Sequence, residues 1–316
     1  MAGPAGMESA YTWMDGALVP TEKAVLPFLT CATHYGLAVF EGIRCYDAAA
    51  GPAIFRLDEH IRRLVDSARN LGLPCPYDAR RLAEACLETV AANGFRSCYV
   101  RPAILVAGGG WNLSLVGVRV AVGIAVWNWG AYLGPDALAA GVRANVSSYT
   151  RHHPNVMMTK SKVAGNYANS ALAKTESVRL GFDEAIMLDP QGFVSECTGE
   201  NLFLVRKGTV YTTPRATILE GVTRDALLTI ARDLGYPVSE QVVTRDQLYM
   251  ADELFVCGTA AEVIGLREVD HRPIGSGATG PVTRALQAAF HDAVRGKTPR
   301  YASWLTPVPA ASTVSV

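Results

Sequence analysis

The chain has 316 residues, 49% hydrophobic and 18% charged, and its 29 acidic residues balance its 29 basic ones. This balance argues against a nucleic-acid or acidic-membrane partner, and the length allows one large or two moderate domains. The seven cysteines include no C-x-x-C pair, so neither a disulfide framework nor a zinc site is indicated. We therefore expect a cytoplasmic protein that acts on small molecules and binds no metal.

The first part of the chain is expected to mix strands with helices. Residues 1–10 have the character of a loose tail, and Asp15-Gly16 between two apolar runs predicts a β-hairpin. Apolar side chains at helical spacing predict helices over Glu59 to Leu71 and about Ala79 to Ala92. Enrichment in β-branched and aromatic residues then predicts strands over Cys98 to Ala107 and Val118 to Trp129. The last of these stretches is too short for a membrane helix.

A second block begins after Leu133-Gly134-Pro135, so we divide the chain into domains 1–133 and 134–316. The block should open with a strand near Val142 to Tyr149, followed by a helix from about Asn166 to Leu180. Residues 297–316 are rich in proline and small side chains, which predicts a loose end.

Two hairpins and a helix are expected further along this block. The hairpins turn at Pro190-Gln191-Gly192 and Lys207-Gly208, and a strand over Val194 to Phe203 carries Glu196, whose carboxylate is expected at a strand terminus. A helix from about Thr223 to Leu234 has Thr223 as its N-cap. Its first N–H groups are suited to hold a phosphate, although an ordinary capped helix has the same appearance.

Lysine is scarce, which shortens the search for a reactive amine. Its six positions are Lys23, Lys160, Lys162, Lys174, Lys207 and Lys297. Lys162, followed later in the chain by the Glu196 carboxylate, suits pyridoxal phosphate chemistry. That cofactor needs an amine for its Schiff base and an acid partner for its pyridine nitrogen. Any single lysine is nevertheless an ordinary surface residue when it is considered alone.

Ordered motifs then carry a resemblance that periodicity does not supply. They are His34-Tyr35-Gly36, Val39-Phe40-Glu41-Gly42-Ile43-Arg44, Tyr99-Val100-Arg101-Pro102, Trp129-Gly130-Ala131-Tyr132-Leu133, Gly165-Asn166-Tyr167, Ser195-Glu196, Gly199-Glu200-Asn201-Leu202-Phe203, Gly221-Val222-Thr223-Arg224-Asp225 and Gly258-Thr259-Ala260-Ala261-Glu262. With these motifs the chain resembles the branched-chain amino acid aminotransferases, which are class IV aminotransferases and fold-type IV pyridoxal-phosphate enzymes. The resemblance implies a two-domain α/β (α+β) fold. A smaller N-terminal α/β domain precedes a larger C-terminal domain with a mixed, barrel-like sheet.

The resemblance also implies which residues hold the cofactor. Lys162 would form the Schiff base and shuttle the proton, because it stands three residues before Gly165-Asn166-Tyr167, whereas Lys160 falls outside that frame. Tyr167 would bind the phenolic oxygen and Glu196 the pyridine nitrogen. The remaining cofactor residues would be Arg63, Leu219, Val222, Thr223, Gly258 and Thr259. The helical pattern alone places Arg63 away from the apolar stripe, where a solvated arginine is the ordinary expectation.

Substrate contacts follow from the resemblance in the same way. Arg101 would receive the acidic arm of 2-oxoglutarate, and Thr259 and Ala260 the substrate α-carboxylate. The other pocket residues would be Tyr35, Phe40, Tyr99, Trp129 and Tyr132, with Tyr35 contributed by a neighbouring subunit. At least a homodimer is implied, with a hexamer as the alternative. The loop Ala107 to Ser114 departs from the family pattern, which leaves the substrate preference open.

Three other functions stay open at this point. One is a D-amino acid or amine transaminase of the same fold, and another is an aminodeoxychorismate lyase, which shares the lysine and the glutamate. The third is a non-catalytic cofactor-binding protein. A requirement for an amino-group acceptor separates the transaminases from the lyase.

Overall fold

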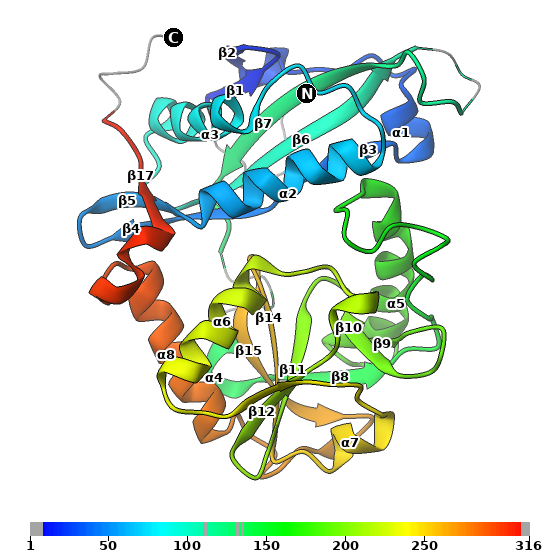
Figure 1. Ribbon diagram of the computed structural model, residues 1–316, viewed down its shortest axis with the longest axis vertical. Helices are drawn as coiled ribbons and strands as arrows, with labels where there is room; N and C mark the ends of the chain where they lie inside the picture. Colours follow the sequence, from blue (N-terminus) through cyan, green and yellow to red (C-terminus); the bar gives the residue numbers. More distant parts are fainter. Residues whose placement is uncertain (1–8, 110, 112, 131–132, 134–135, 311–316) are drawn as a thin grey trace. The chain divides into compact units, whose positions relative to one another are not determined.

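The computed structural model describes residues 9–109, 111, 113–130, 133 and 136–310, and the chain divides into two compact units (Figure 1). Unit 1 takes in the chain up to Trp129, the segment Ser161–Gly165 and the chain from Asp292 onward. Unit 2 takes in Gly130–Lys160 and Asn166–His291. The chain first passes from unit 1 to unit 2 between Trp129 and Gly130, close to the boundary expected from the sequence. The grouping of residues 161–165 and 292–316 with the N-terminal unit differs from that expectation.

Unit 1 is built on an antiparallel sheet. Its strands have the order β17-β5-β4-β6-β7-β1-β2, with β3 paired to β6. Their bounds are Tyr11–Met14 (β1), Ala17–Pro20 (β2), Ala38–Phe40 (β3), Ile43–Ala48 (β4), Gly51–Phe55 (β5), Cys98–Gly108 (β6), Arg119–Trp127 (β7) and Leu305–Pro307 (β17). The predicted hairpin at Asp15-Gly16 is confirmed, since Met14 pairs with Ala17 and both turn residues have positive φ.

Two long helices cover the sheet of unit 1 and form its core. They are α2 (Leu57–Asn70) and α3 (Ala79–Asn93), and the short α1 (Cys31–Tyr35) precedes β3. The side chains of Ile61 and Leu64 on α2 are fully buried, as the predicted apolar stripe requires. The Asp78 side chain caps α3 by accepting a hydrogen bond from Arg81 N at 2.8 Å.

The chain from residue 299 to 307 is ordered, which corrects the expectation of a loose end. Residues Pro299–Trp304 form a 3-10 helix (η4), and β17 pairs with β5 in the register Leu305↔Phe55. The carbonyl of Trp304 also accepts a hydrogen bond from Arg56 N at 2.7 Å. Proline and small residues therefore do not prevent pairing here, because β17 lies at the sheet edge.

Unit 2 contains a mixed sheet with the strand order β10-β9-β8-β15-β14-β11-β12-β13, and β16 pairs with β15. The pairs β8/β9, β8/β15 and β12/β13 are parallel and the other pairs are antiparallel. The bounds are Val142–Val146 (β8), Glu184–Leu188 (β9), Val194–Cys197 (β10), Asn201–Arg206 (β11), Thr209–Thr212 (β12), Val238–Glu240 (β13), Glu253–Gly258 (β14), Glu262–Val269 (β15) and Arg272–Pro273 (β16). Both predicted hairpins are present, as β9/β10 and β11/β12.

Helices flank this second sheet. They are α4 (Ala137–Ala140), α5 (Tyr167–Arg179), α6 (Val222–Asp233), α7 (Arg245–Tyr249) and α8 (Pro281–Val294), with short 3-10 turns at Ala164–Asn166 (η2) and Arg215–Thr217 (η3). Helix α6 packs on β14 and α5 packs on β9. The start of α6 therefore lies near the end of the sheet that carries the motifs of residues 199–203 and 258–262.

Two local expectations for this unit are wrong. The strand expected over Val194 to Phe203 is interrupted after Cys197, where the amide and hydroxyl of Thr198 donate to the buried carboxylate of Glu184 at 3.2 and 2.5 Å. The N-cap of α6 is Gly221, and Thr223 is the second helical residue, with its side chain buried. A buried threonine at that position cannot fold back as a cap.

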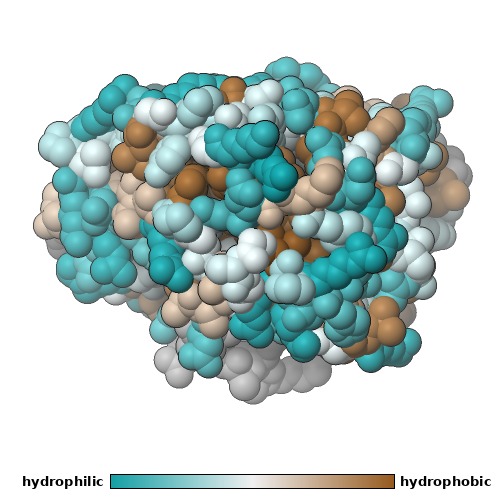
Figure 2. Space-filling view, turned by 90° about the horizontal axis from the view of Figure 1, so that it is seen from below, coloured by the Kyte–Doolittle hydropathy of each residue, from teal (hydrophilic) through white to brown (hydrophobic). Residues whose placement is uncertain are grey.

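The surface and the cysteines add two simple observations. Figure 2 shows one face, on which hydrophilic side chains predominate and hydrophobic ones gather in small separate patches. Among the described residues, no helix has the length and apolar character needed to cross a membrane. All seven cysteines are free thiols.

Candidate active site

Lys162 lies on an extended segment that backbone hydrogen bonds hold within unit 1. Its carbonyl oxygen accepts from Phe40 N at 3.1 Å, and its amide donates to Ser67 Oγ on α2 at 3.0 Å. The next residue, Val163, forms an antiparallel bridge with Val39. The Lys162 Nζ atom lies 5.2 Å from the centre of the Phe40 ring. The segment is thus fixed on both sides, and the amine lies against the aromatic face.

The backbones of two distant motifs contact each other beside Lys162, at Gly36 and Gly165. The amide of Gly165 donates to the carbonyl of Gly36 at 3.1 Å. A Cβ atom at residue 36 would lie 2.8 Å from the Gly165 Cα, closer than real Cβ contacts, and Gly36 has φ +67°. Residue 36 therefore needs to be glycine, because a side chain there would meet the backbone of Gly165.

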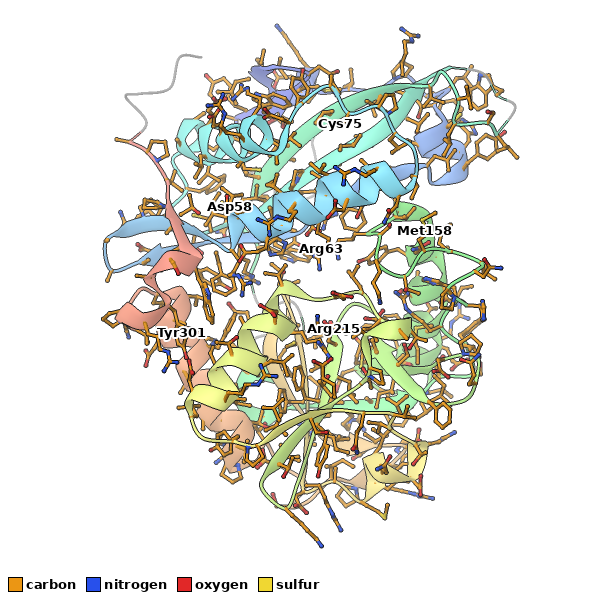
Figure 3. All side chains as sticks on the ribbon, in the orientation of Figure 1. Asp58, Arg63, Cys75, Met158, Arg215 and Tyr301 are labelled. Atoms are coloured by element: carbon orange, nitrogen blue, oxygen red, sulfur yellow. The ribbon has the colours of Figure 1, made fainter. Side chains whose placement is uncertain are left out.

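Glu41 is buried in unit 1, where its carboxylate contacts His60 and Arg63 of α2. Arg63 Nε and Nη2 donate to its two oxygens at 2.6 and 2.8 Å, and His60 Nδ1 lies 2.8 Å from Oε2. Burial by itself raises the pKa of Glu41, but the charges and hydrogen bonds of Arg63 and His60 outweigh it and hold the pKa well below its ordinary range. Burial also lowers the pKa of His60. The Arg63 side chain, labelled on α2 in Figure 3, is only 13% exposed, so the solvated arginine expected from the helical pattern is wrong.

Arg101 on β6 lies among aromatic rings of the same unit. Its Cζ atom is 4.6 Å from the ring centre of Phe40 and 5.3 Å from that of Tyr99. The Tyr99 ring is in turn 4.6 Å from that of Trp129. Gly42 permits this packing, because a Cβ atom there would lie 1.8 Å from the Tyr99 hydroxyl oxygen. Four of the predicted substrate residues thus lie together.

The other two predicted aromatic residues do not join this group in the described structure. Tyr35 is 47% exposed and has its ring 6.1 Å from that of Trp111. Tyr132 lies outside the described residues.

In unit 2, Glu196 is held in place by three groups. Arg151 Nη2 lies 2.7 Å from Oε1, Asn201 Nδ2 donates to Oε2 at 3.1 Å, and the amide of Leu219 donates to both oxygens at 3.2 and 3.3 Å. Both ionic side chains are at least nine-tenths buried. The result is a fixed, ionic acceptor of the kind that a protonated ring nitrogen requires.

Sequence reasoning missed Arg151 and Asn201. Arg151 directly precedes His152 and His153 and belongs to none of the recognised motifs, so nothing in the neighbouring sequence indicated a role for it. Asn201 belongs to a recognised motif, yet the motif assigns it no role. Its Nδ2 also donates to Leu219 O at 3.0 Å, and Gly221 leaves room for its Oδ1, which would lie 2.0 Å from an added Cβ. Asn201 therefore ties the Glu196 carboxylate to the start of α6.

The other predicted cofactor residues of unit 2 lie on helix starts and on one turn. Val222 and Thr223 open α6, whose Gly221 N-cap contributes no side-chain hydrogen bond. Gly258 ends β14, and Thr259 and Ala260 form the turn to β15. Asn201 on β11 pairs with Cys257 on β14, so the turn that starts after Gly258 lies close to Asn201. Tyr167 is the first residue of α5.

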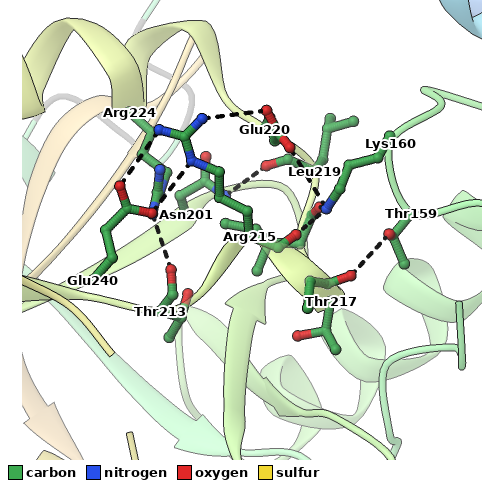
Figure 4. Close-up of polar contacts among 12 residues, drawn as sticks. Thr159, Lys160, Asn201, Thr213, Arg215, Thr217, Leu219, Glu220, Arg224 and Glu240 are labelled. Atoms are coloured by element: carbon green, nitrogen blue, oxygen red, sulfur yellow. Dashed lines mark hydrogen bonds and ion pairs between the residues drawn. The ribbon is translucent and has the colours of Figure 1, made fainter. Parts of the chain in front are cut away.

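Lys160 has a structural setting that differs from that of Lys162. Its Nζ atom donates to the carbonyls of Arg215 and Ile218, the latter at 3.0 Å, and lies 3.9 Å from Glu220; Lys160, Arg215 and Glu220 are labelled in Figure 4. Thr159 donates to the carbonyl of Ala216 at 3.3 Å. Burial lowers the pKa of Lys160. These contacts fix the turn that leads into α6.

A pair of buried carboxyl groups lies beside the strand break in unit 2. Lys174 Nζ forms a 2.5 Å ion pair with Glu184, and both Glu184 and Glu200 are almost inaccessible to solvent. Burial, together with the negative charge of Glu184, raises the pKa of Glu200 to about 8. Glu200 therefore holds its proton at neutral pH.

Comparison with known proteins identifies the family. Residues 38–269 match the model of the family described as amino-transferase class IV. The chain belongs to the class IV aminotransferases. This aminotransferase is 47% identical over 294 residues to the branched-chain-amino-acid aminotransferase of Pseudomonas aeruginosa, covering 93% of this chain and 96% of the relative.

Solved structures agree with the family. A branched-chain amino acid aminotransferase from T.th. with pyridoxamine 5'-phosphate matches with a TM-score of 0.93 and 48% identity, covering 96% of this aminotransferase and all of that chain. The same protein complexed with N-(5'-phosphopyridoxyl)-L-glutamate matches with a TM-score of 0.92 and 48% identity, at the same coverage. The family and the fold class inferred from the motifs are thereby confirmed.

Proposed function

We propose that this aminotransferase moves the amino group between L-leucine, L-isoleucine or L-valine and 2-oxoglutarate, with pyridoxal 5'-phosphate as its cofactor. The relatives named for this activity match nearly the whole chain, as do solved relatives that carry the cofactor. The observation that carries the proposal is the Phe40 ring, which has the Lys162 amine on it at 5.2 Å and the Arg101 guanidinium at 4.6 Å. A reactive amine and a distal cation thus flank one apolar surface.

The residues present fit this cofactor. The start of α6 has N–H groups without a side-chain cap, which suits a phosphate, and Arg63 supplies a planar cation. Glu196 is an ionic acceptor for a protonated ring nitrogen, and Lys162 is the amine. When bound, the cofactor supplies an electron sink for the charge that develops at the substrate α-carbon.

The chain's own residues then position and move the proton. Lys162 Nζ takes the proton from the substrate α-carbon and returns it during transfer, so one group serves as base and then as acid. Glu196, fixed by Arg151, Asn201 and the amide of Leu219, would pair with the protonated ring nitrogen of the bound cofactor. Tyr167 would donate a hydrogen bond to the phenolic oxygen of the cofactor. Arg63, Val222, Thr223 and Thr259 would hold the phosphate, and Gly258 beside Thr259 lacks a Cβ that would lie 3.2 Å from the carbonyl oxygen of Gly199.

The substrate side must accept both an aliphatic chain and an acidic one, and we assign this to Phe40, Tyr99, Trp129, Tyr132 and Arg101. The rings provide the apolar wall, and the Arg101 fork receives the distal carboxylate of glutamate or 2-oxoglutarate. The Thr259-Ala260 turn receives the α-carboxylate through its amides.

A homodimer, with Tyr35 serving the partner's site, and a cytoplasmic location are part of the proposal. Unit 1 exposes the apolar side chains of Phe28, Leu29, Tyr35, Trp111, Leu113 and Val116, and exposed apolar surface is typical of protein interfaces. Ring contacts of His34 and Tyr35 with Trp111 join the two segments that carry these side chains. The free thiols fit a reducing compartment.

A panel of donors and acceptors tests the reaction. Purified protein with the cofactor should convert L-leucine, L-isoleucine and L-valine only when 2-oxoglutarate is present. Conversion of D-amino acids or amines instead would favour the other transaminases, and pyruvate release from aminodeoxychorismate would point to the lyase.

A pair of lysine variants tests the site. Lys162→Ala should abolish both the visible absorbance of the bound cofactor and the activity. Lys160→Ala is the matched control, because it removes a lysine two residues away whose Nζ atom contacts the carbonyls of Arg215 and Ile218 and the carboxylate of Glu220. It should keep the absorbance and most of the activity. The opposite pattern would refute the assignment of Lys162.

A further inference from the structure

Arg101 is a cation whose neighbours in the structure are aromatic rings. Besides Phe40 and Tyr99, the ring of Trp127 lies 5.5 Å from its Cζ atom. Its Nε is buried and makes no hydrogen bond, and no carboxylate of the described residues forms an ion pair with it. The rings therefore take the place that an acidic side chain usually has beside a half-buried arginine.

Strand pairing explains why Trp127 reaches this guanidinium. In the β6/β7 pair, Tyr99 is opposite Trp127 and Arg101 is opposite Ala125, so all four side chains lie on one face of the sheet. The small Ala125 leaves space above it. Trp127 is the diagonal neighbour of Arg101, at the distance that long side chains span across a sheet. Its ring also packs against Tyr99 at 5.0 Å and Trp129 at 5.7 Å, which fixes its orientation.

A guanidinium has different partners for its faces and its edge. Aromatic rings attract the flat faces, whereas its N–H groups bind a carboxylate in the plane of the fork. Ring contacts therefore hold the plane of Arg101 without occupying the donors that a substrate carboxylate needs. An internal acid would instead neutralise those donors.

We propose that Trp127 is a positioning residue for the acidic substrates: it holds the Arg101 guanidinium in the orientation that binds the distal carboxylate of glutamate and 2-oxoglutarate. Aliphatic substrates have no group for this fork, so Trp127 sets the preference for dicarboxylic over aliphatic substrates. The inference rests on the proposed function, in which Arg101 receives that carboxylate.

Binding of two unreactive acids to the cofactor-loaded enzyme tests the proposal. Glutarate carries the distal carboxylate and 4-methylvalerate carries an aliphatic end instead, and calorimetric titration gives the affinity for each. Trp127→Leu should weaken glutarate binding about tenfold, the strength of a desolvated cation–aromatic contact, and change 4-methylvalerate binding less than about twofold. Trp127→Phe keeps a ring over the guanidinium and should restore most of the glutarate affinity. In turnover, Trp127→Leu should raise KM for 2-oxoglutarate with little change in kcat for leucine.

Two further variants separate the possible failures. Trp304→Leu removes an arginine–tryptophan contact elsewhere in this unit, with Arg56 at 5.2 Å, and should change neither affinity. If Trp127→Leu weakens both acids equally, or neither, the inference is overturned. If Arg101→Leu also leaves glutarate binding intact, the proposed role of Arg101 fails and the inference fails with it. If Arg101→Leu weakens glutarate while Trp127→Leu does not, only the inference fails.

Discussion

Replacing Glu41 by glutamine should strongly destabilise the protein. The carboxylate is fully buried and receives two hydrogen bonds from Arg63 and one from His60, and Arg63 is only 13% exposed. Removing one partner of a buried ion pair leaves an uncompensated charge, which costs about 3 to 5 kcal/mol. Because the Arg63 guanidinium retains some access to water, we expect about 3 kcal/mol.

Urea unfolding measures this loss of stability. A chain of this length should have a slope of about 3 kcal/mol per molar urea, so Glu41→Gln should lower the midpoint by about 1 M. The matched control is Asp47→Asn, which breaks the exposed Arg96–Asp47 pair and should leave the midpoint unchanged, because solvent screens such pairs. A Glu41→Gln midpoint no lower than that of the control would refute the reasoning.

The pH dependence gives a second check on the same variant. The pKa of Glu41 is lowered in the folded protein from an ordinary value of 4.5, so its stabilising contribution is present above that value. It is lost as the pH falls further toward the folded pKa. The difference between the parent and Glu41→Gln should therefore be constant near neutral pH and shrink below about pH 4.5.

Three further changes test other parts of the molecule. The pKa of Glu200 is raised to about 8, so its contribution to stability is complete below 4.5 and is lost as the pH rises through 8. The thermal unfolding temperature of the parent should fall between pH 5 and pH 9, and it should fall less in Glu200→Gln. Parallel pH curves for the two proteins would contradict this. Gly221→Ala should displace Asn201 and lower cofactor affinity at least about tenfold, since cofactor contacts depend on placement within about 1 Å. Gly123→Ala, whose methyl group meets nothing within 4 Å, should keep the parent's affinity in the same equilibrium dialysis. Arg151→Met should leave the Glu196 carboxylate buried without its cation and lower the free energy of unfolding by about 3 kcal/mol, measured by urea unfolding. Adding Glu196→Gln in the same chain should restore the urea midpoint, because it removes the buried charge.

Elements with a local signal could be predicted from the sequence. The helix expected over Ala79 to Ala92 is α3, and the hairpin at Asp15-Gly16 and the strand starting at Cys98 are present. Helical periodicity and turn residues act over a few neighbours, so one sequence suffices to find them. The predicted site residues came instead from the motifs that carry the family resemblance, and the roles assigned to them stay predictions.

What could not be predicted depends on contacts between distant residues. From the sequence alone, the charge of Arg63 predicts a solvent-exposed side chain. Its burial depends on the ion pair with Glu41, which is 22 residues away in the chain. Arg151 and Asn201 matter through Glu196, and β17 forms because β5 offers an unpaired edge to it. The break after Cys197 arises from the buried Glu184. Tertiary partners of this kind leave no periodic trace in the sequence.

The assignment of Ser161–Gly165 and the chain from Asp292 onward to unit 1 has a consequence for dividing the gene. Neither unit is one continuous stretch of chain, since three stretches make unit 1 and two make unit 2. A fragment ending at Trp129 would lack Lys162, the predicted Schiff-base lysine, as well as the Val39↔Val163 bridge and the strand that covers the edge of β5. Such a fragment would expose an open sheet edge and invite aggregation. Split versions of this enzyme should therefore be cut within a loop of one unit and not at the border between the two.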